Sequence, residues 1–69
     1  MAVSIYHVEC TVDGAWSRYG VCADGKTDAA RIVQARVKRD GYQRFAHIDT
    51  LRVGPNDTGW DIGGTICYE

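Results

Sequence analysis

Several features that would indicate export, disulfide bonding or membrane insertion are missing from this sequence of 69 residues. No apolar run approaches the roughly 20 residues of a membrane-spanning helix, and the first residues show neither the basic nor the apolar segment of a signal peptide. The three cysteines, Cys10, Cys22 and Cys67, are odd in number and show no CxxC pairing. We therefore expect a soluble cytoplasmic protein, not bound to membranes, whose reduced thiols act as small apolar side chains.

The spacing patterns of metal sites and of catalytic sites are also missing. The histidines and cysteines form none of the close pairs that structural zinc sites use, so we expect no metal and no cofactor. His47 and Asp49 have the same strand parity and are predicted to share a face, but no nucleophile motif surrounds any cysteine. The sequence therefore predicts no catalytic residue and no enzyme activity.

The length and composition are those of one small globular domain spanning residues 1–69. Hydrophobic residues make up 45% of the chain and charged residues 25%, which is ordinary for a folded domain. Domains seldom have fewer than about 50 residues, so a second one does not fit. A domain this short buries only about 60% of its unfolded surface, and its core must therefore be efficient or shared with a partner.

A β-hairpin is predicted at the start of the chain. Residues 3–12 are rich in β-branched and aromatic types, and Asp13-Gly14 follows as a two-residue turn. With these two residues as the loop, a mostly apolar face separates from a mixed one. The same register sets Glu9 opposite Arg18, a favourable cross-strand charge pair.

A helix is predicted from about Asp28 to Asp40. Thr27 offers an N-cap oxygen, Asp28 places a carboxylate in the first turn, and Gly41 stands where a C′ glycine is expected. The apolar stripe is modest and made of small residues. The helix is expected to pack closely on a sheet through Ala30, Val33 and Val37.

A second hairpin with a longer loop is predicted after the helix. Residues 45–53 and 60–68 are rich in β-forming types, and the turn-rich stretch 54–59 separates them. Ile48 and Leu51 have opposite parity, so either a bulge intervenes or one of them faces outward. The order ββαββ predicts an α+β fold, a four-stranded antiparallel sheet with one helix packed on one face.

Such a fold leaves the other face of the sheet uncovered. An apolar and aromatic patch there would indicate a homodimer or a partner surface, whereas scattered apolar surface residues are normal and need no partner. Both interpretations stay open at this stage. The side chains that we place on this face are Ile5, His7, Trp16 and Cys22, with Phe45 or Leu51 as further candidates.

Charge is unevenly distributed although the whole chain carries only −1. The net charge is −2 over residues 1–25, +4 over residues 26–52 and −3 over residues 53–69. The basic segment can meet an acidic partner or nucleic-acid phosphates, or it can be a solvated helix face that complements the helix dipole. The candidate partner-binding residues are Arg31, Arg36, Lys38, Arg39, Tyr42 and Arg44.

The overall plan resembles that of small phage-encoded inhibitor proteins of the anti-CRISPR type. The resemblance is carried by the short chain, the ββαββ order, the run TDAARIVQARVKRDGY leading into HIDTLRV, and the closing GWDIGGTICYE. It implies a non-enzymatic interaction module that occupies a host protein or nucleoprotein complex, such as a CRISPR effector, and blocks its nucleic-acid or partner site. The alternative is a small nucleic-acid-binding module using the basic helix, which the pI near 6 does not favour.

Overall fold

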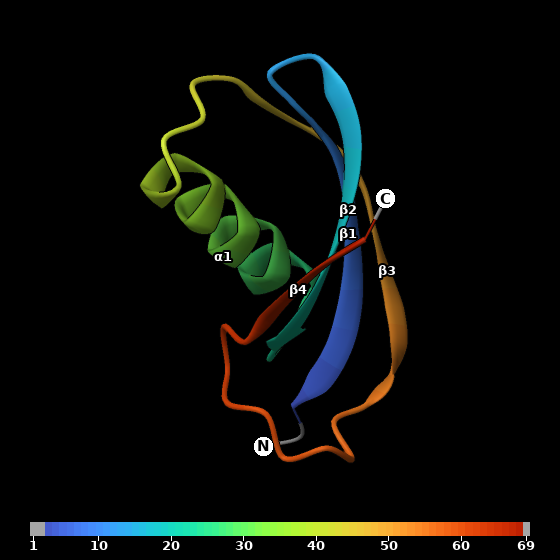
Figure 1. Cartoon of the computed structure of the whole chain (residues 1–69). Coiled ribbons are helices and arrows are strands. Elements are labelled where there is room, and N and C mark those ends of the chain that lie inside the picture. The colour runs from blue at the N-terminus through green and yellow to red at the C-terminus, as the bar shows by residue number, and fades with distance from the viewer. Residues whose placement is uncertain (1–2, 69) are drawn as a thin grey trace.

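A long hairpin, a helix and a third long strand follow one another along the chain (Figure 1). The computed structural model describes residues 3–68, and it describes side chains for residues 3–64. The side chain of Cys67 and the whole of Glu69 therefore lie outside the described part. The elements are β1 (Ser4–Val12), β2 (Ala15–Ala23), α1 (Lys26–Arg39), β3 (Phe45–Pro55) and β4 (Thr65–Tyr68).

The strands form an antiparallel sheet in the order β3-β1-β2-β4, and α1 lies against one face of it (Figure 1). The predicted α+β fold with a helix on an antiparallel sheet is thereby confirmed. The predicted set of four full strands holds only in part. Three long strands make up the body of the sheet, whereas β4 is a short edge strand of four residues beside β2.

The first hairpin forms with the predicted turn and register. Asp13 and Gly14 have φ of 50° and 84°, the positive values that a two-residue type I′ turn requires. Glu9 pairs with Arg18 across the two strands, as expected. Burial alternates strictly along β1, with every second residue buried under the helix.

The helix begins earlier than predicted, at Lys26, and ends at Arg39. Gly25 occupies the N-cap position and supplies no side-chain hydrogen bond, so the predicted cap Thr27 lies inside the first turn. The residues buried against the sheet are Ala29, Val33 and Val37. Ala29 thus takes the place predicted for Ala30, which is only half-buried.

The C-terminal end of α1 closes as a Schellman motif. The Gly41 N–H donates to the Lys38 carbonyl at 3.1 Å, and the Tyr42 N–H donates to the Val37 carbonyl at 3.2 Å. Gly41 has φ of 94°, which a glycine adopts without the steric cost of a Cβ. The predicted C′ glycine is therefore confirmed, and this motif fixes where the chain leaves the helix.

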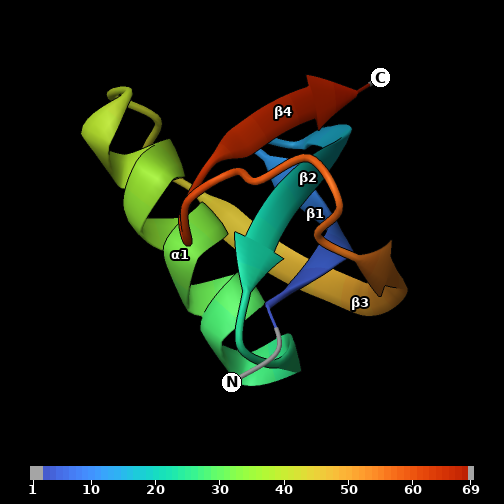
Figure 2. The same ribbon diagram turned by 90° about the horizontal axis from the view of Figure 1, so that it is seen from below.

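The predicted second hairpin is wrong. β3 pairs with β1 and β4 pairs with β2, so the two strands lie at opposite edges of the sheet (Figure 2). β3 occupies the edge of β1 that β2 leaves open, and residues 56–64 cross the end of the sheet to reach β2 (Figure 2). The final strand shortens to Thr65–Tyr68 because Gly63 has φ of 91° and the Gly64 N–H bonds back to the Asp61 carbonyl at 3.0 Å.

The mixed parity of the third strand comes from bulges. The pairing of β1 with β3 shifts register once between Glu9 and Cys10, where Ile48 is the extra residue, and once between Ile5 and Tyr6, where Val53 is the extra residue. Ile48 and Val53 are both about half exposed. A bulge is one of the two outcomes that the sequence left open.

The core lies between α1 and the helix-facing side of β1 and β2. Phe45 packs against this core and is therefore not on the opposite face. The core cluster consists of Tyr6, Val8, Cys10, Val12, Tyr19, Val21, Ala23, Ala29, Val33 and Val37.

The opposite side of the sheet is covered by no helix of the described chain (Figure 1). We call it the open face. Residues paired across the strands share it, and they are Ile5, His7, Glu9 and Thr11 of β1, Trp16, Arg18 and Cys22 of β2, and Ala46, Asp49 and Leu51 of β3.

Candidate functional site

Two of the six predicted site residues have their charge engaged locally. Arg31 contacts the Asp28 carboxylate at 2.7 Å, and Arg36 Nε lies 3.4 Å from Asp40 Oδ2. Both pairs join residues one helical turn apart and are well exposed, so each contributes at most about 0.5 kcal/mol to stability. These two arginines belong to a solvated helix face, which is the simpler of the two interpretations of the basic segment.

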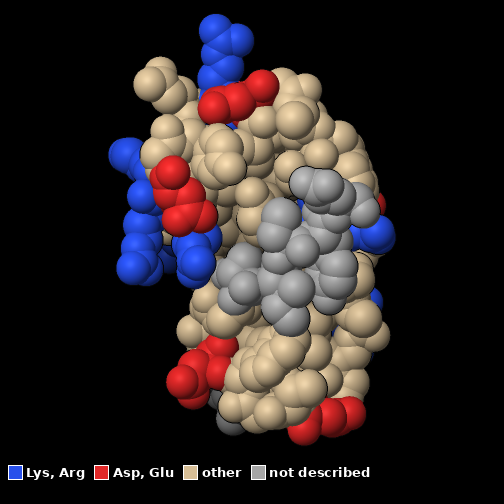
Figure 3. Space-filling model, in the orientation of Figure 1, with Lys and Arg blue, Asp and Glu red and all other residues tan. Residues whose placement is uncertain are grey.

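The other four predicted residues gather at one end of the molecule. Lys38 and Arg39 end the helix, Tyr42 and Arg44 follow in the connection to β3, and all four are exposed. Among residues 3–64, none of the three cations forms an ion pair. We call this group, Lys38, Arg39, Tyr42 and Arg44, the basic tip. Figure 3 shows Lys and Arg atoms along the side of α1 and at its end of the molecule, with some acidic atoms beside them and others at the opposite end.

Asp13 holds the connection that carries the basic tip. Its Oδ1 accepts hydrogen bonds from the Gln43 N–H at 3.1 Å and from the Arg44 N–H at 2.8 Å. Its own N–H donates to the Arg44 carbonyl at 2.9 Å. The hairpin turn is thereby tied to the loop after α1, and the Tyr42 and Arg44 side chains project from a braced backbone.

Asp13 was predicted as a residue of the hairpin turn, and its second role as a brace of the later loop was not predicted. The signal lies in the residue type, because Asp and Asn tolerate positive φ and their side-chain oxygen can accept from neighbouring backbone N–H groups. What the sequence does not show is that the loop 31 positions later supplies those N–H groups. A shallow hollow of about 440 Å³ lies at this junction, lined by Asp13, Gly41, Gln43 and Arg44.

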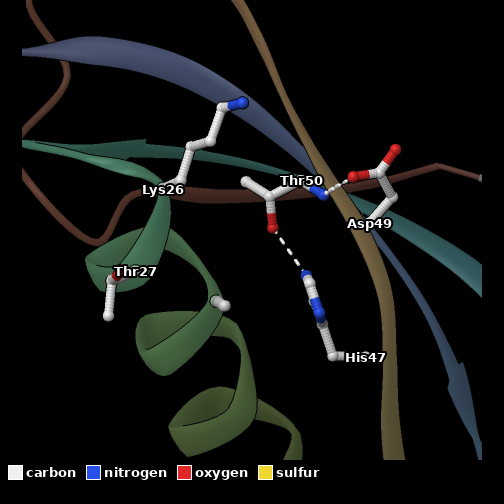
Figure 4. Close-up of a pocket in the computed structure, with 6 residues that line it drawn as sticks. Lys26, Thr27, His47, Asp49 and Thr50 are labelled. Carbon is white, nitrogen blue, oxygen red and sulfur yellow. Dashed lines mark hydrogen bonds between the residues drawn. The ribbon is translucent and has the colours of Figure 1, made fainter.

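A second depression, of about 360 Å³, lies between the start of α1 and β3 (Figure 4). His47 Nε2 lies 2.7 Å from Thr50 Oγ1, and both side chains point toward the helix. Asp49 points to the other side of β3, where its Oδ1 accepts the Thr50 N–H at 2.8 Å. The prediction that His47 and Asp49 share a face is therefore wrong, because the bulge at Ile48 reverses the parity between them.

The residues from Gly20 to Thr27 match the pattern G-x-x-x-x-G-K-[ST] of a phosphate-binding loop. That motif needs a loop between the two glycines whose backbone wraps the phosphates. Here β2 continues to Ala23, so the first glycine and the three residues after it are paired strand. The sequence pattern therefore matches, but the backbone does not form a phosphate-binding loop.

The described thiols lie away from solvent. Cys10 and Cys22 are both fully buried and neither forms a disulfide. Burial raises the pKa of the Cys22 thiol, which keeps it protonated and unreactive near neutral pH. Among the described residues there is no group of three or more His, Cys, Asp or Glu that could hold a metal ion. The helix found in residues 3–68 is too short to cross a membrane.

Comparison of the chain with protein-family models, with curated proteins and with solved structures finds no match. The candidate site consists of three exposed cations and a tyrosine on a braced end of the fold, next to a shallow hollow.

Proposed function

We propose that this protein is a non-enzymatic interaction module whose basic tip binds an acidic surface of a host protein or nucleoprotein complex. The observation that supports it is the bracing of the loop after α1 by Asp13. A fixed loop loses little conformational entropy on binding, and Arg and Tyr are among the side chains that contribute most at interfaces. The resemblance to anti-CRISPR proteins gives the proposed role, a phage or mobile-element inhibitor acting in the cytoplasm on a complex such as a CRISPR effector.

The location of unpaired charge favours the tip over the helix face. Arg31 and Arg36 must give up a carboxylate neighbour before they bind another anion, whereas Lys38, Arg39 and Arg44 have no such neighbour among the side chains of residues 3–64. Tyr42, 47% exposed, adds a rigid amphipathic ring between them. The contact set inferred from the sequence thus narrows to the four residues of the basic tip.

The test compares three full-length tagged proteins in host-cell lysate treated with nuclease. The tip variant carries Lys38→Glu, Arg39→Glu and Arg44→Glu, and the matched control carries Arg31→Glu and Arg36→Glu. We expect the unmodified chain and the control to retain the same defined complex, and the tip variant to lose it by about tenfold or more. Equal retention by the tip variant, with an unchanged circular dichroism spectrum, would remove the tip from the site.

The alternative, direct binding to nucleic acid, is separated by the same samples. It predicts that nothing is retained after nuclease treatment and that purified chain binds labelled DNA or RNA at low salt. Three phosphate contacts would give a slope of about −2.7 in log binding constant against log salt on duplex DNA. Absence of any such binding at low salt excludes this alternative.

A further inference from the structure

The open face carries exposed apolar side chains that the basic tip does not use. Trp16 is 47% exposed on β2 and Leu51 is 46% exposed on β3. Between these two strands, Ile5, His7 and Thr11 of the central strand are only half-buried. Cys22, at the other end of the face, is fully buried, so the face is closed there and open toward Trp16 and Leu51. A covering layer over the open part would remove its apolar area from water.

A row of charged residues crosses this face at right angles to the strands. Arg18 on β2 pairs with Glu9 on β1, and Glu9 pairs in turn with Asp49 on β3. Neighbouring strands lie about 4.8 Å apart, so Arg18 and Asp49 stand roughly 10 Å from each other on the two flanks of Glu9. The row is positive at one end and negative at the other.

The neighbouring row of residues is also asymmetric across the sheet, in the size of its side chains. Trp16 on β2, Thr11 on β1 and Ala46 on β3 lie side by side. The Arg18 guanidinium lies 5.7 Å from the centroid of the Trp16 ring, so the two bulky side chains of β2 form one unit. Both rows therefore place a large side chain on β2 and a small or acidic one on β3.

We propose that the open face binds a second copy of this chain, about a two-fold axis parallel to β1. This rotation sets β1 over β1 and β2 of each copy over β3 of the other. Arg18 of one copy then faces Asp49 of the second copy, and Trp16 faces Ala46. Both contacts occur twice, as an isologous interface requires.

A different axis does not give this match. Rotation about a line along the charged row sets Arg18 against Arg18 and Asp49 against Asp49. Those like charges repel, whereas the axis parallel to β1 makes two opposite-charge contacts and leaves only Glu9 facing its own copy. Aligned packing of two sheets at a separation of about 10 Å is also a common arrangement.

The size of the face sets the expected strength. The end of the face at Cys22 is closed, so about six positions of β1, from His7 to Val12, remain open. At about 3.3 Å for each residue and about 4.8 Å for each of three strands, they give roughly 300 Å² in projection per copy. That lies at the small end for a specific interface, so the dimer should dissociate on dilution. The inference goes beyond the proposed function, and because it does not involve the basic tip, either one can fail alone.

The test is a charge swap followed by sedimentation of the full-length chain. The unmodified protein, of 7.6 kDa, should pass from monomer to dimer as its concentration rises from about 10 μM to about 1 mM. Arg18→Asp alone and Asp49→Arg alone should each raise the dimer dissociation constant by about tenfold or more, since each puts like charges together twice. An equimolar mixture of the two variants should restore the dimer, because each contact then joins opposite charges.

The control variant is Arg31→Asp, which makes the same charge change on the outer face of α1 and should leave dimerisation unchanged. Misfolding cannot imitate the expected result, because mixing two unfolded variants restores nothing. If circular dichroism shows that a variant is unfolded, Arg18→Gln and Asp49→Asn replace the swapped pair and should each weaken the dimer. An unmodified chain that stays monomeric at 1 mM, or folded variants whose mixture stays monomeric, overturns the proposal.

Discussion

The two faces of β1 are built from alternate residues of one strand, yet they have opposite surroundings. Tyr6, Val8, Cys10 and Val12 are buried under α1, whereas the residues between them are half-buried on the open face. The covered face holds the fold together through apolar burial. The open face contributes less to folding, and it carries the exposed Trp16 and Leu51 together with the charged row of Arg18, Glu9 and Asp49.

The largest expected effect on the free energy of unfolding comes from introducing an aspartate on the covered face rather than on the open face. Val8→Asp places a carboxylate in the core with no partner, which should cost more than about 4 kcal/mol and prevent folding. Thr11→Asp, on the same strand and the opposite face, should cost less than about 1 kcal/mol. Urea denaturation followed by circular dichroism measures both. Similar losses for the two variants would mean that the faces do not differ as described.

A smaller effect is expected where the strand ends at the hairpin turn. Asp13→Ala removes the acceptor of two backbone N–H groups and should lower the free energy of unfolding by about 1–2 kcal/mol. Asp13→Asn keeps an acceptor oxygen and tolerates the positive φ, so it should lose less. Hydrogen exchange at the amides of Gln43 and Arg44 should accelerate in the alanine variant. Unchanged exchange there would show that Asp13 does not brace the loop.

The smallest expected effect concerns Cys22, at the end of the open face that the chain itself covers. Cys22 has the parity of that face but is fully buried, where the Gly63 N–H donates to its carbonyl at 2.8 Å. Burial raises the pKa of its thiol above the ordinary 9.0, so the stability linked to the protonated thiol is complete below the unfolded-state pKa. This stability is lost as the pH rises through the folded-state pKa.

The measurement is the free energy of unfolding from about pH 7 to about pH 10.5 for the unmodified chain and for Cys22→Ala. The unmodified chain should lose more stability toward alkaline pH than the variant does. Comparing slopes rather than absolute values removes the cost of the cavity left by the missing sulfur. Parallel slopes would contradict the assignment of a protonated, buried thiol to this position.

The hairpin and the end of the helix could be predicted because their signals are local. Asp13-Gly14 fixes a register between adjacent segments, and Gly41 fixes a Schellman motif within three residues of the helix end. The partner of β3 could not be predicted in this way. Both β1 and the later strand had suitable patterns, and the choice depends on which sheet edge is free when the chain returns from α1.

The candidate site shows the same division. Exposed basic residues at the end of a helix follow from its sequence, so Lys38 and Arg39 were found. Which cations are already engaged depends on rotamers, and the separation of His47 from Asp49 depends on a bulge that no single residue specifies. The bracing by Asp13 joins segments 31 positions apart and has no local signature.

The bulges of β3 also have a consequence for solubility at high concentration. β3 is a long strand at an outer edge of the sheet, and such edges are templates on which further strands can add. Ile48 and Val53 break its ladder at two points, so an arriving strand meets only short stretches of regular backbone between them. The β3 edge, although rich in apolar side chains, is therefore a poor template for fibril growth. Backbone geometry, rather than charge, discourages edge-to-edge addition of further strands.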